Sequence, residues 1–378
     1  MPAFNGNVAV NTGRMFFIAA TPETTYDTAV EPTHRLLHAG DWAPLVLDGT
    51  IISDREYANG NITDFPTKDL LLDRRVSGPI TLWAGIESVP MIIAKALSTD
   101  TYTATGKHVI TAQDRPHFLS GATIEEHTMG GAIDANRDSR FTGICINDWE
   151  LSWGGPGFAT IACGLQGSGS RVGTGLAADV ATVPDKFLTT AKIRSSFQRA
   201  TTAGQSLADA APSSFSAIVG AFNAADTGAT LASHLITKAS LKWNNGLTDG
   251  RYGGVSASAD SVGGAPFAAN RSCEFACDMM LDEASELFMR AYQDRTAINE
   301  FAWMFDFAGH TANFGGRIAL PITALIAPPV LSTGNGPTSM SLRFQVRKSS
   351  LVAQAALAIL TATFHNGDNA AYSAVAPA

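Results

Sequence analysis

Charged residues are scarce in this sequence. Asp, Glu, Lys and Arg make up 16% of the 378 residues, against about 25% in an ordinary soluble domain. A surface this poor in charge is typical of a protein that other subunits cover over much of its area. The net charge of -8 gives the chain no overall attraction for DNA or for an anionic membrane.

Long apolar runs and targeting signals are missing as well. No stretch of 18 or more apolar residues occurs, so we expect no transmembrane helix and no membrane partner. The N-terminus has neither the basic start nor the continuous apolar core of a signal peptide. The four cysteines form no CxxC pair, which indicates buried free thiols in a protein made in a cytoplasm.

Motifs that would indicate an enzyme are also missing: there is no P-loop, no GxGxxG and no GxSxG. Three residue pairs are weak candidates for a metal site, a disulfide or acid–base chemistry, namely His34 and His38, Cys273 and Cys277, and Asp148 and Glu150. The histidines have no third ligand nearby, and the cysteines would lie about 13 Å apart on one strand. A solvated strand face explains the two acids better than catalysis does. We therefore expect no enzyme, no cofactor and no metal.

Two triplets, at Asn61 and Asn270, fit the glycosylation sequon. Such triplets are common by chance, and nothing in the sequence indicates secretion. We give them no role.

Apolar residues, in contrast, are plentiful at 45% of the chain. That fraction excludes disorder of the whole chain, and the length suits two domains of about 150–200 residues. Residues 141–155 alternate apolar and polar positions, with a phase shift at Asn147 and Asp148 that predicts a β-bulge. Residues 157–169 follow a Gly-rich turn and read as the hairpin partner. Further strands are expected at 42–51, 236–243, 273–280, 299–307, 316–327 and 339–346.

Two segments have helical spacing. The first, at about 87–97, has Ser88 as its expected N-cap and Pro90 in the first turn. The second, at about 282–292, has Asp282 as its N-cap. Each shows one apolar stripe, made of Val89, Ile92, Ile93 and Ala96 in the first and of Ala284, Leu287, Phe288 and Ala291 in the second.

These helices reveal an internal repeat. Each follows a strand that is expected to begin just after an arginine, Arg75 or Arg271. A long polar segment precedes each arginine, at 52–73 and 244–270. The order strand, long hairpin, strand, helix, strands therefore occurs twice. This predicts a first domain at 1–170, a connector at 171–210, a second domain at 211–366 and an extended C-terminal tail at 367–378.

Four stretches then resemble siphophage tail tube proteins, also called major tail proteins. The stretch FTGICINDWELSWGG resembles that family's aromatic-Thr-Gly-x-x-Val/Ile-Asn-x-hydrophobic-x-Leu-Ser strand. GRMFFIAATPETTYDTAVEP resembles the family's common start, with Asp27 where the family usually has Gly. RRVSGPITLWAGIESVPMIIAKAL is similar to its strand-then-helix unit, and RIALPITALIAPPVLSTGNGPTSMSLRFQV to its closing hairpin. The resemblance spans nearly the whole chain apart from about 168–211.

The resemblance implies tandem β-sandwich or barrel-like domains, each with one flanking helix and a long hairpin. Sheets of this family join side by side into rings, and the rings stack into a hollow tube through which DNA passes without specific binding. Six-fold tube-domain symmetry with two domains per chain favours three chains per ring over six. The protein is then expected in the virion, made in the bacterial host cytoplasm, with other tail proteins at the tube ends. The acidic balance suits a conduit that repels the DNA backbone.

The two long polar segments are the expected contacts between stacked rings, helped by both chain ends, because alone they have too little apolar surface to stay ordered. The contact residues expected there are Asp54, Arg55, Asn59, Asn61, Asp64, Lys68, Asn244, Asn245, Asp249 and Arg251.

Two alternatives stay open at this point. A distal tail or tail-terminator protein would share the fold but cap the tube. A carbohydrate-binding β-sandwich would need clustered exposed aromatics, whereas the six Trp are scattered.

Overall fold

The computed structural model describes residues 13–39, 45–54, 68–97, 99–103, 106–112, 119–129, 139–168, 171–172, 187–200, 230–231, 236–250, 264–294, 299–308, 314–332, 337–348, 358–366, 368 and 370–373. These residues form a mainly β protein with one large antiparallel sheet system and two α-helices. The mainly β fold class predicted from the alternating segments is confirmed.

Strands of the N-terminal half are β1 Gly13–Ile18, β2 His34–Leu36, β3 Val46–Asp54, β4 Lys68–Trp83, β5 Thr101–Thr103, β6 Lys107–Thr111, β7 Ala122–Met129, β8 Ser139–Gly154, β9 Thr160–Gly167 and β10 Arg171–Val172. Those of the C-terminal half are β11 Ile193–Arg199, β12 Thr230–Leu231, β13 Ile236–Asn244, β14 Leu247–Gly250, β15 Gly264–Ala268, β16 Ser272–Met280, β17 Glu300–Ala308, β18 Gly315–Leu325, β19 Val330–Leu331, β20 Ser339–Val346 and β21 Thr361–His365. A short 3-10 helix, η2, covers Thr190–Lys192.

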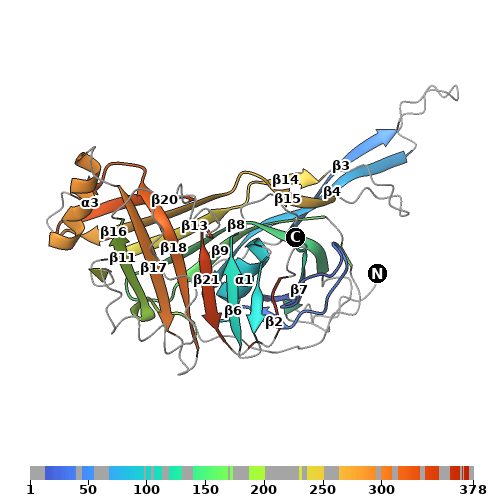
Figure 1. The fold of residues 1–378 in the computed structure, drawn as a ribbon. Coiled ribbons are helices and arrows are strands. Elements are labelled where there is room, and N and C mark those ends of the chain that lie inside the picture. Colours follow the sequence, from blue (N-terminus) through green and yellow to red (C-terminus); the bar gives the residue numbers. More distant parts are fainter. Residues whose placement is uncertain are drawn as a thin grey trace, which may run out of the picture.

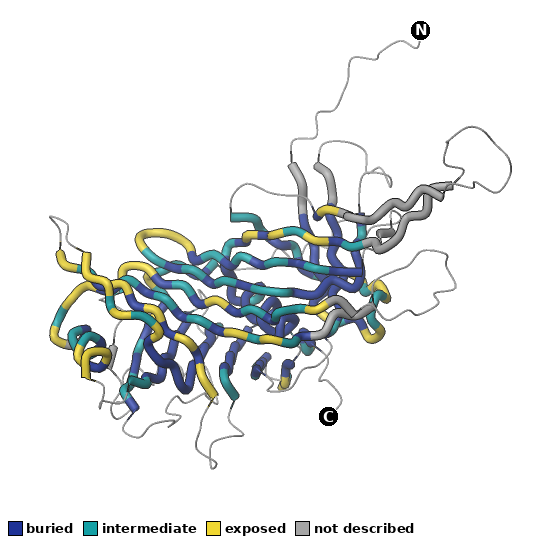
Figure 2. Tube along the Cα trace, turned by 90° about the horizontal axis from the view of Figure 1, so that it is seen from above, coloured by how far each residue is buried: buried dark blue, intermediate teal, exposed yellow. Residues whose placement is uncertain are grey.

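One layer of the molecule is a long sheet that spans both halves of the chain. Its strands pair in the order β3-β4-β9-β8-β13-β16-β20-β19, and every pairing is antiparallel. In Figure 1 these strands run along the length of the molecule, and Figure 2 shows them from above. Buried and more exposed residues alternate along them, because one face packs on the core and the other does not. We call this layer the long sheet.

The second layer crosses under the long sheet (Figure 1). It contains β12-β11-β17-β18-β21-β6-β5, again all antiparallel, and a smaller group β2-β1-β7 that pairs with β8. Two strands belong to both layers. β8 pairs with β7 through its first half and with β9 and β13 through its second, while the end of β18 pairs with β20. These shared strands hold the two layers together.

The predicted bulge and hairpin are both confirmed. β8 and β9 pair as expected, and their register shifts between Ile146 and Asp148, which leaves Asn147 unpaired across the hairpin. The strand after the first polar segment differs from the prediction. β4 begins at Lys68 and not after Arg75, because residues 68–72 continue the pairing with β3 beyond the arginine.

Both predicted helices are present, as α1 Ser88–Leu97 and α3 Glu283–Gln293. Asp282 caps α3 as expected, and its carboxylate accepts a hydrogen bond from the Ser285 backbone N–H at 2.8 Å. The expectation for α1 was wrong in two respects. Ser88 is the first helical residue and not the N-cap, and all ten residues of the helix are buried where a single apolar stripe was predicted. A helix covered on all sides lies inside the molecule, and Figure 1 shows α1 between the two layers.

One hydrophobic cluster runs through both halves, from Phe16 to Tyr372. Its densest part is aromatic: the ring centroid of Phe275 lies 4.8 Å from those of both Trp303 and Phe305. The C-terminal tail also differs from its prediction as an extended arm. Tyr372 is fully buried in this cluster, so the described part of the tail packs on its own chain.

Candidate assembly surface

The long sheet contains an internal joint at which strand β8 of the N-terminal half pairs with β13 of the C-terminal half. Seven consecutive residue pairs form it, from Asp148 opposite Asn244 to Gly154 opposite Lys238. Side chains on its inner face are large and apolar, with Trp149 opposite Trp243, and both are buried. The joint therefore joins two sections of sheet edge to edge with continuous backbone pairing and a shared core.

Two asparagines fix the end of this joint. The Asn245 side chain donates to the backbone carbonyls of Ala96 at 2.7 Å and Ile146 at 2.9 Å, and accepts from the Trp243 indole N–H at 2.9 Å. The bulged Asn147 accepts from the Leu247 backbone N–H at 2.9 Å. The amide of Asn245 thus ties helix α1, the bulge of β8 and strand β13 to one another.

Among the residues that the structure describes, the long sheet ends at β3 on one side and at Leu325 and β19 on the other. Within the described part of the chain, β3 pairs only with β4. Exposed apolar side chains lie at both edges. Val46 of β3 is 54% exposed, and at the opposite edge Ile326 is 40% and Val330 63% exposed. An open edge with exposed apolar residues is a site for pairing with another chain.

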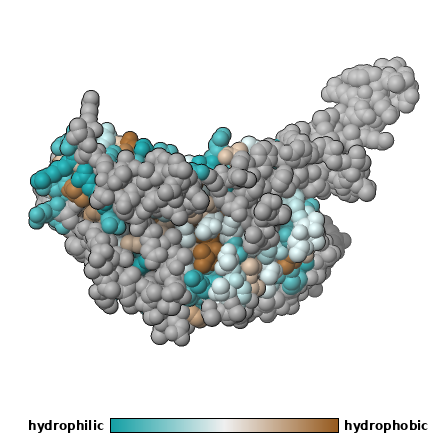
Figure 3. All heavy atoms as spheres, viewed as in Figure 1, coloured by the Kyte–Doolittle hydropathy of each residue, from teal (hydrophilic) through white to brown (hydrophobic). Residues whose placement is uncertain are grey.

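More apolar surface continues around the second edge. Met280 and Leu281 at the end of β16 and Leu331 of β19 are exposed as well. Figure 3 shows hydrophobic atoms among hydrophilic ones at this end of the molecule, where α3 lies. The two ends of the long sheet therefore offer apolar side chains that a second copy could cover.

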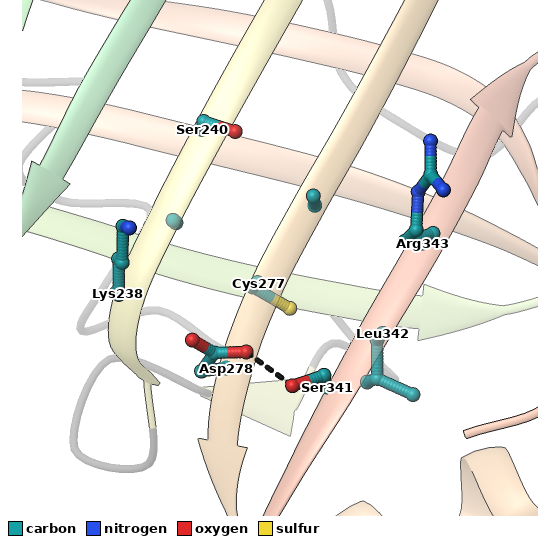
Figure 4. Close-up of a pocket in the computed structure, with 9 residues that line it drawn as sticks. Lys238, Ser240, Cys277, Asp278, Ser341, Leu342 and Arg343 are labelled. Atoms are coloured by element: carbon teal, nitrogen blue, oxygen red, sulfur yellow. Dashed lines mark hydrogen bonds between the residues drawn. The ribbon is translucent and has the colours of Figure 1, made fainter. Parts of the chain in front are cut away.

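The outer face of the long sheet is different in character, because its side chains are small or polar. A shallow hollow of about 250 Å³ lies there between Lys238, Asp278 and Arg343 (Figure 4). It exists because the residues at its floor, among them Ala276, are short. Asp278 accepts a hydrogen bond from the Ser341 hydroxyl at 2.5 Å. Arg343 forms an exposed ion pair of 3.4 Å with Glu274. The described lining of the hollow thus contains one hydroxyl in contact with a carboxylate, and it contains no histidine.

The residues predicted for inter-ring contact fall into three groups. Asp54 and Lys68 stand opposite each other at the end of the β3–β4 pairing, Asn244 is half-buried at the end of β13, and Asp249 lies in β14. Asn245 does not fit the expectation: it is fully buried and all its side-chain contacts lie within its own chain. The others lie outside the described residues, namely Arg55, Asn59, Asn61, Asp64 and Arg251.

The weak chemical candidates do not come together in the fold. His34 contacts Asp368 at 3.2 Å, whereas the ring of His38 lies against Phe16. Cys273 and Cys277 are buried, which raises the pKa of both thiols and leaves them unreactive. Among the residues that the structure describes, no three His, Cys, Asp or Glu side chains are grouped so that they could hold a metal ion.

Two buried polar clusters were not predicted from the sequence. In the first, the Glu23 carboxylate accepts from the Gly143 backbone N–H and the Thr123 hydroxyl, each at 2.9 Å. Burial raises the pKa of Glu23 despite these contacts. In the second, Lys95 of α1 is 1% exposed and donates to backbone carbonyls from both ends of the chain. The sequence features that could have indicated these clusters were Glu23 in the opening motif and Lys95 in an otherwise apolar helix.

No helix in the described portion of the chain is long and apolar enough to cross a membrane. No family model matches the sequence, and no curated protein matches it either.

Proposed function

We propose that this chain is a structural protein of a siphophage-type tail, which polymerises into stacked rings and forms the hollow tube through which the genome passes. The internal joint between β8 and β13 carries the proposal. At this joint the sheet of the N-terminal half pairs edge to edge with the sheet of the C-terminal half. Within the described residues, each end of the combined long sheet is an open edge. A ring of such chains needs only the same kind of joint between copies.

A repeated pairing order supports the duplication of a tube-type domain. The first half pairs β3-β4-β9-β8 in the long sheet and β2-β1-β7-β8 beneath it. The second half pairs β13-β16-β20-β18 and β12-β11-β17-β18. In chain order, each strand of the first set has a counterpart at the same place in the second set. One helix follows the second long-sheet strand in each set, α1 after β4 and α3 after β16.

The first proposed domain is 1–170. The connector predicted at 171–210 has to be shortened, because β11 at Ile193–Arg199 lies within it and pairs with β17. The second proposed domain therefore begins at β11 and not at 211, and it ends at 366. Each would be a β-sandwich with one long hairpin and one helix, which is buried as α1 in the first domain and partly exposed as α3 in the second. The hairpins are the outer part of β3–β4 and the pair β14–β15, which extend toward the same side of the molecule (Figure 1). That common direction supports their proposed contact with a neighbouring ring.

The same correspondence identifies the proposed joint between copies. When the two sets are compared, β3 is the counterpart of β13. The end of β18 together with β19 is the counterpart of the second half of β8. The edge at Val46 of one copy would therefore pair with the stretch 325–331 of the next, because Thr323 and Ala324 are already paired with both β17 and β20. Two domains per chain and six-fold tube-domain symmetry then give three chains per ring, in place of six.

The first prediction tests these edges. Val46→Lys or Val330→Lys places a charge at one edge, where both side chains are more than half exposed in the single chain. We expect folding to be retained, because exposed substitutions cost little stability. Ring and tube formation should be lost, because an uncompensated lysine would be buried in the joint between copies. Negative-stain images and native mass spectrometry check this result, with three chains expected per ring.

Tyr292→Lys on α3 is the control, since Tyr292 is 40% exposed and belongs to no strand of the long sheet. Tubes formed normally by both edge variants would contradict the proposed joint. Closed rings that never stack would instead indicate a distal tail or tail-terminator protein, and six chains per ring would contradict the duplicated domain as a ring unit.

A further inference from the structure

The loop after strand β1 and a segment near the C-terminus meet at one buried side chain. The ammonium group of Lys95 lies 3.1 Å from the carbonyl oxygen of Ala20 and 3.5 Å from that of Thr21, in the loop between β1 and β2. It also lies 3.3 Å from the carbonyl oxygen of Tyr372, near the C-terminus. We call residues 19–33 the N-terminal loop and the described residues of 366–373 the C-terminal strap.

The strap is held mainly by its backbone. The Tyr372 N–H donates to the Asp100 carboxylate at 2.8 Å, while its carbonyl accepts from Lys95. The same carboxylate oxygen lies 2.9 Å from Nδ1 of His108. The imidazole of His108 stacks on the Tyr372 ring with a centroid distance of 4.3 Å. Asp100, Lys95 and His108 thus surround Tyr372 of the strap.

The side chain of Tyr372 is fixed as well. Its hydroxyl hydrogen-bonds to Asp368 of the strap and accepts from the Asn366 amide at 2.8 Å. Asp368 in turn contacts His34 of β2 at 3.2 Å. A second contact to the first half joins the hydroxyls of Ser373 and Ser120 at 3.1 Å. Every one of these partners outside the strap belongs to the N-terminal half of the chain.

We propose that Lys95 acts as a clamp that couples the two ends of the chain, so that release of the C-terminal strap also loosens the N-terminal loop. The geometry that carries this is a single amine, buried in α1, that bridges carbonyls of both segments. A neutral amine still has two N–H bonds, which suffice for the two shorter contacts, so the clamp does not need the charge.

Hydrogen exchange followed by mass spectrometry on the unassembled full chain tests the clamp. Ending the chain after Ala371 removes Tyr372 and its carbonyl, and we expect amide exchange in the N-terminal loop at residues 19–23 to become at least about tenfold faster. Lys95→Met, which keeps the length of the side chain, should speed exchange in the loop and the strap together. Lys242→Met, on the exposed outer face of β13, is the matched control and should change neither.

Asp100→Asn provides a second route in case Lys95→Met does not fold. It weakens the hold on the Tyr372 N–H while the amine of Lys95 stays in place, and it should also loosen both segments. The clamp is wrong if truncation frees the strap and leaves exchange in the N-terminal loop unchanged, or if Lys95→Met affects one segment alone. Because these measurements use single chains, they do not depend on whether rings form.

Discussion

At the scale of single residues, Asp27 shows how a non-glycine residue is held in a left-handed backbone conformation. Its φ of 66° makes it the one non-glycine residue with positive φ in the described part of the chain. The left-handed region favours glycine, and Asp is among the few residues that tolerate it. The Asp27 carboxylate accepts from the Thr142 hydroxyl at 2.5 Å and the Ser168 hydroxyl at 2.7 Å. The sequence departed from the tail-tube pattern at this position, and the structure supplies the compensating contacts.

The second prediction compares two substitutions at this position. Asp27→Ala removes both hydrogen bonds and keeps a Cβ in a left-handed backbone, so we expect a loss of about 2–3 kcal/mol in the free energy of unfolding. Asp27→Gly loses the same bonds but relieves the strain, and should be less destabilising by about 1 kcal/mol. Urea unfolding of the unassembled chain measures both. An alanine variant as stable as the glycine variant would show that the backbone strain is negligible.

The third prediction concerns the ionisation of Lys95. Burial lowers the pKa of Lys95 to about 7 in the folded chain, from an ordinary value of 10.5, although Glu23 and Asp100 oppose the shift. Between these two values the unfolded chain binds a proton that the folded chain does not. The contribution of Lys95 to stability therefore rises as the pH increases from about 7 toward 10.

Lys95→Met is the reference for this measurement, because every other titrating group is common to both chains. The free energy of unfolding of the wild type minus that of the variant should increase across this pH range, by a few kcal/mol at most. A difference that stays flat, or falls, would show that the lysine is charged in the folded chain throughout.

At the scale of elements, the two helices differ in what stabilises them. The helix α1 is covered on all sides, whereas α3 ends the molecule with several exposed residues and depends more on its own caps. In α3 the Asp282 carboxylate accepts from the Ser285 N–H, and the Ser285 hydroxyl accepts from the Asp282 N–H at 2.7 Å. The two residues form a reciprocal capping box.

The fourth prediction follows from this box. Asp282→Ala should cost about 1 kcal/mol in unfolding free energy, and Asp282→Asn much less, since an amide oxygen can also accept the bond. Urea unfolding with circular dichroism measures the difference. Equal effects of the two substitutions would indicate that the charge of Asp282 near the helix N-terminus matters more than its hydrogen bond.

The elements also show what a single sequence can and cannot reveal. Alternation predicted β8, β9 and the bulge at Asn147, because a period of two and its interruption are local properties. The burial of α1 on all sides was missed, since its covering layers come from distant strands. The role of Asn245 was missed for the same reason: its partners Ala96 and Ile146 are remote in sequence, and a polar residue in a polar segment reads as surface.

At the scale of the whole molecule, the order of elements was accessible from the sequence but their pairing across the two halves was not. The repeat of strand, hairpin, strand and helix could be read along the chain. The joint of β8 with β13, the placement of β21 against β6 and the docking of the tail through Tyr372 required the structure. The candidate edges could not be predicted either, because which strands end a sheet depends on all its other pairings.

The position of β21 has a consequence for the biosynthesis of the chain. This strand fills the place between β18 and β6, and it pairs with β6 across roughly 250 residues of sequence. A ribosome therefore releases the strand that completes the second layer only after nearly every other element has been made. Contacts of such long range form slowly, and a nascent chain would leave the β6 edge open until β21 has been made. The second layer can thus close only after β21 has left the ribosome, later than every other element that the structure describes.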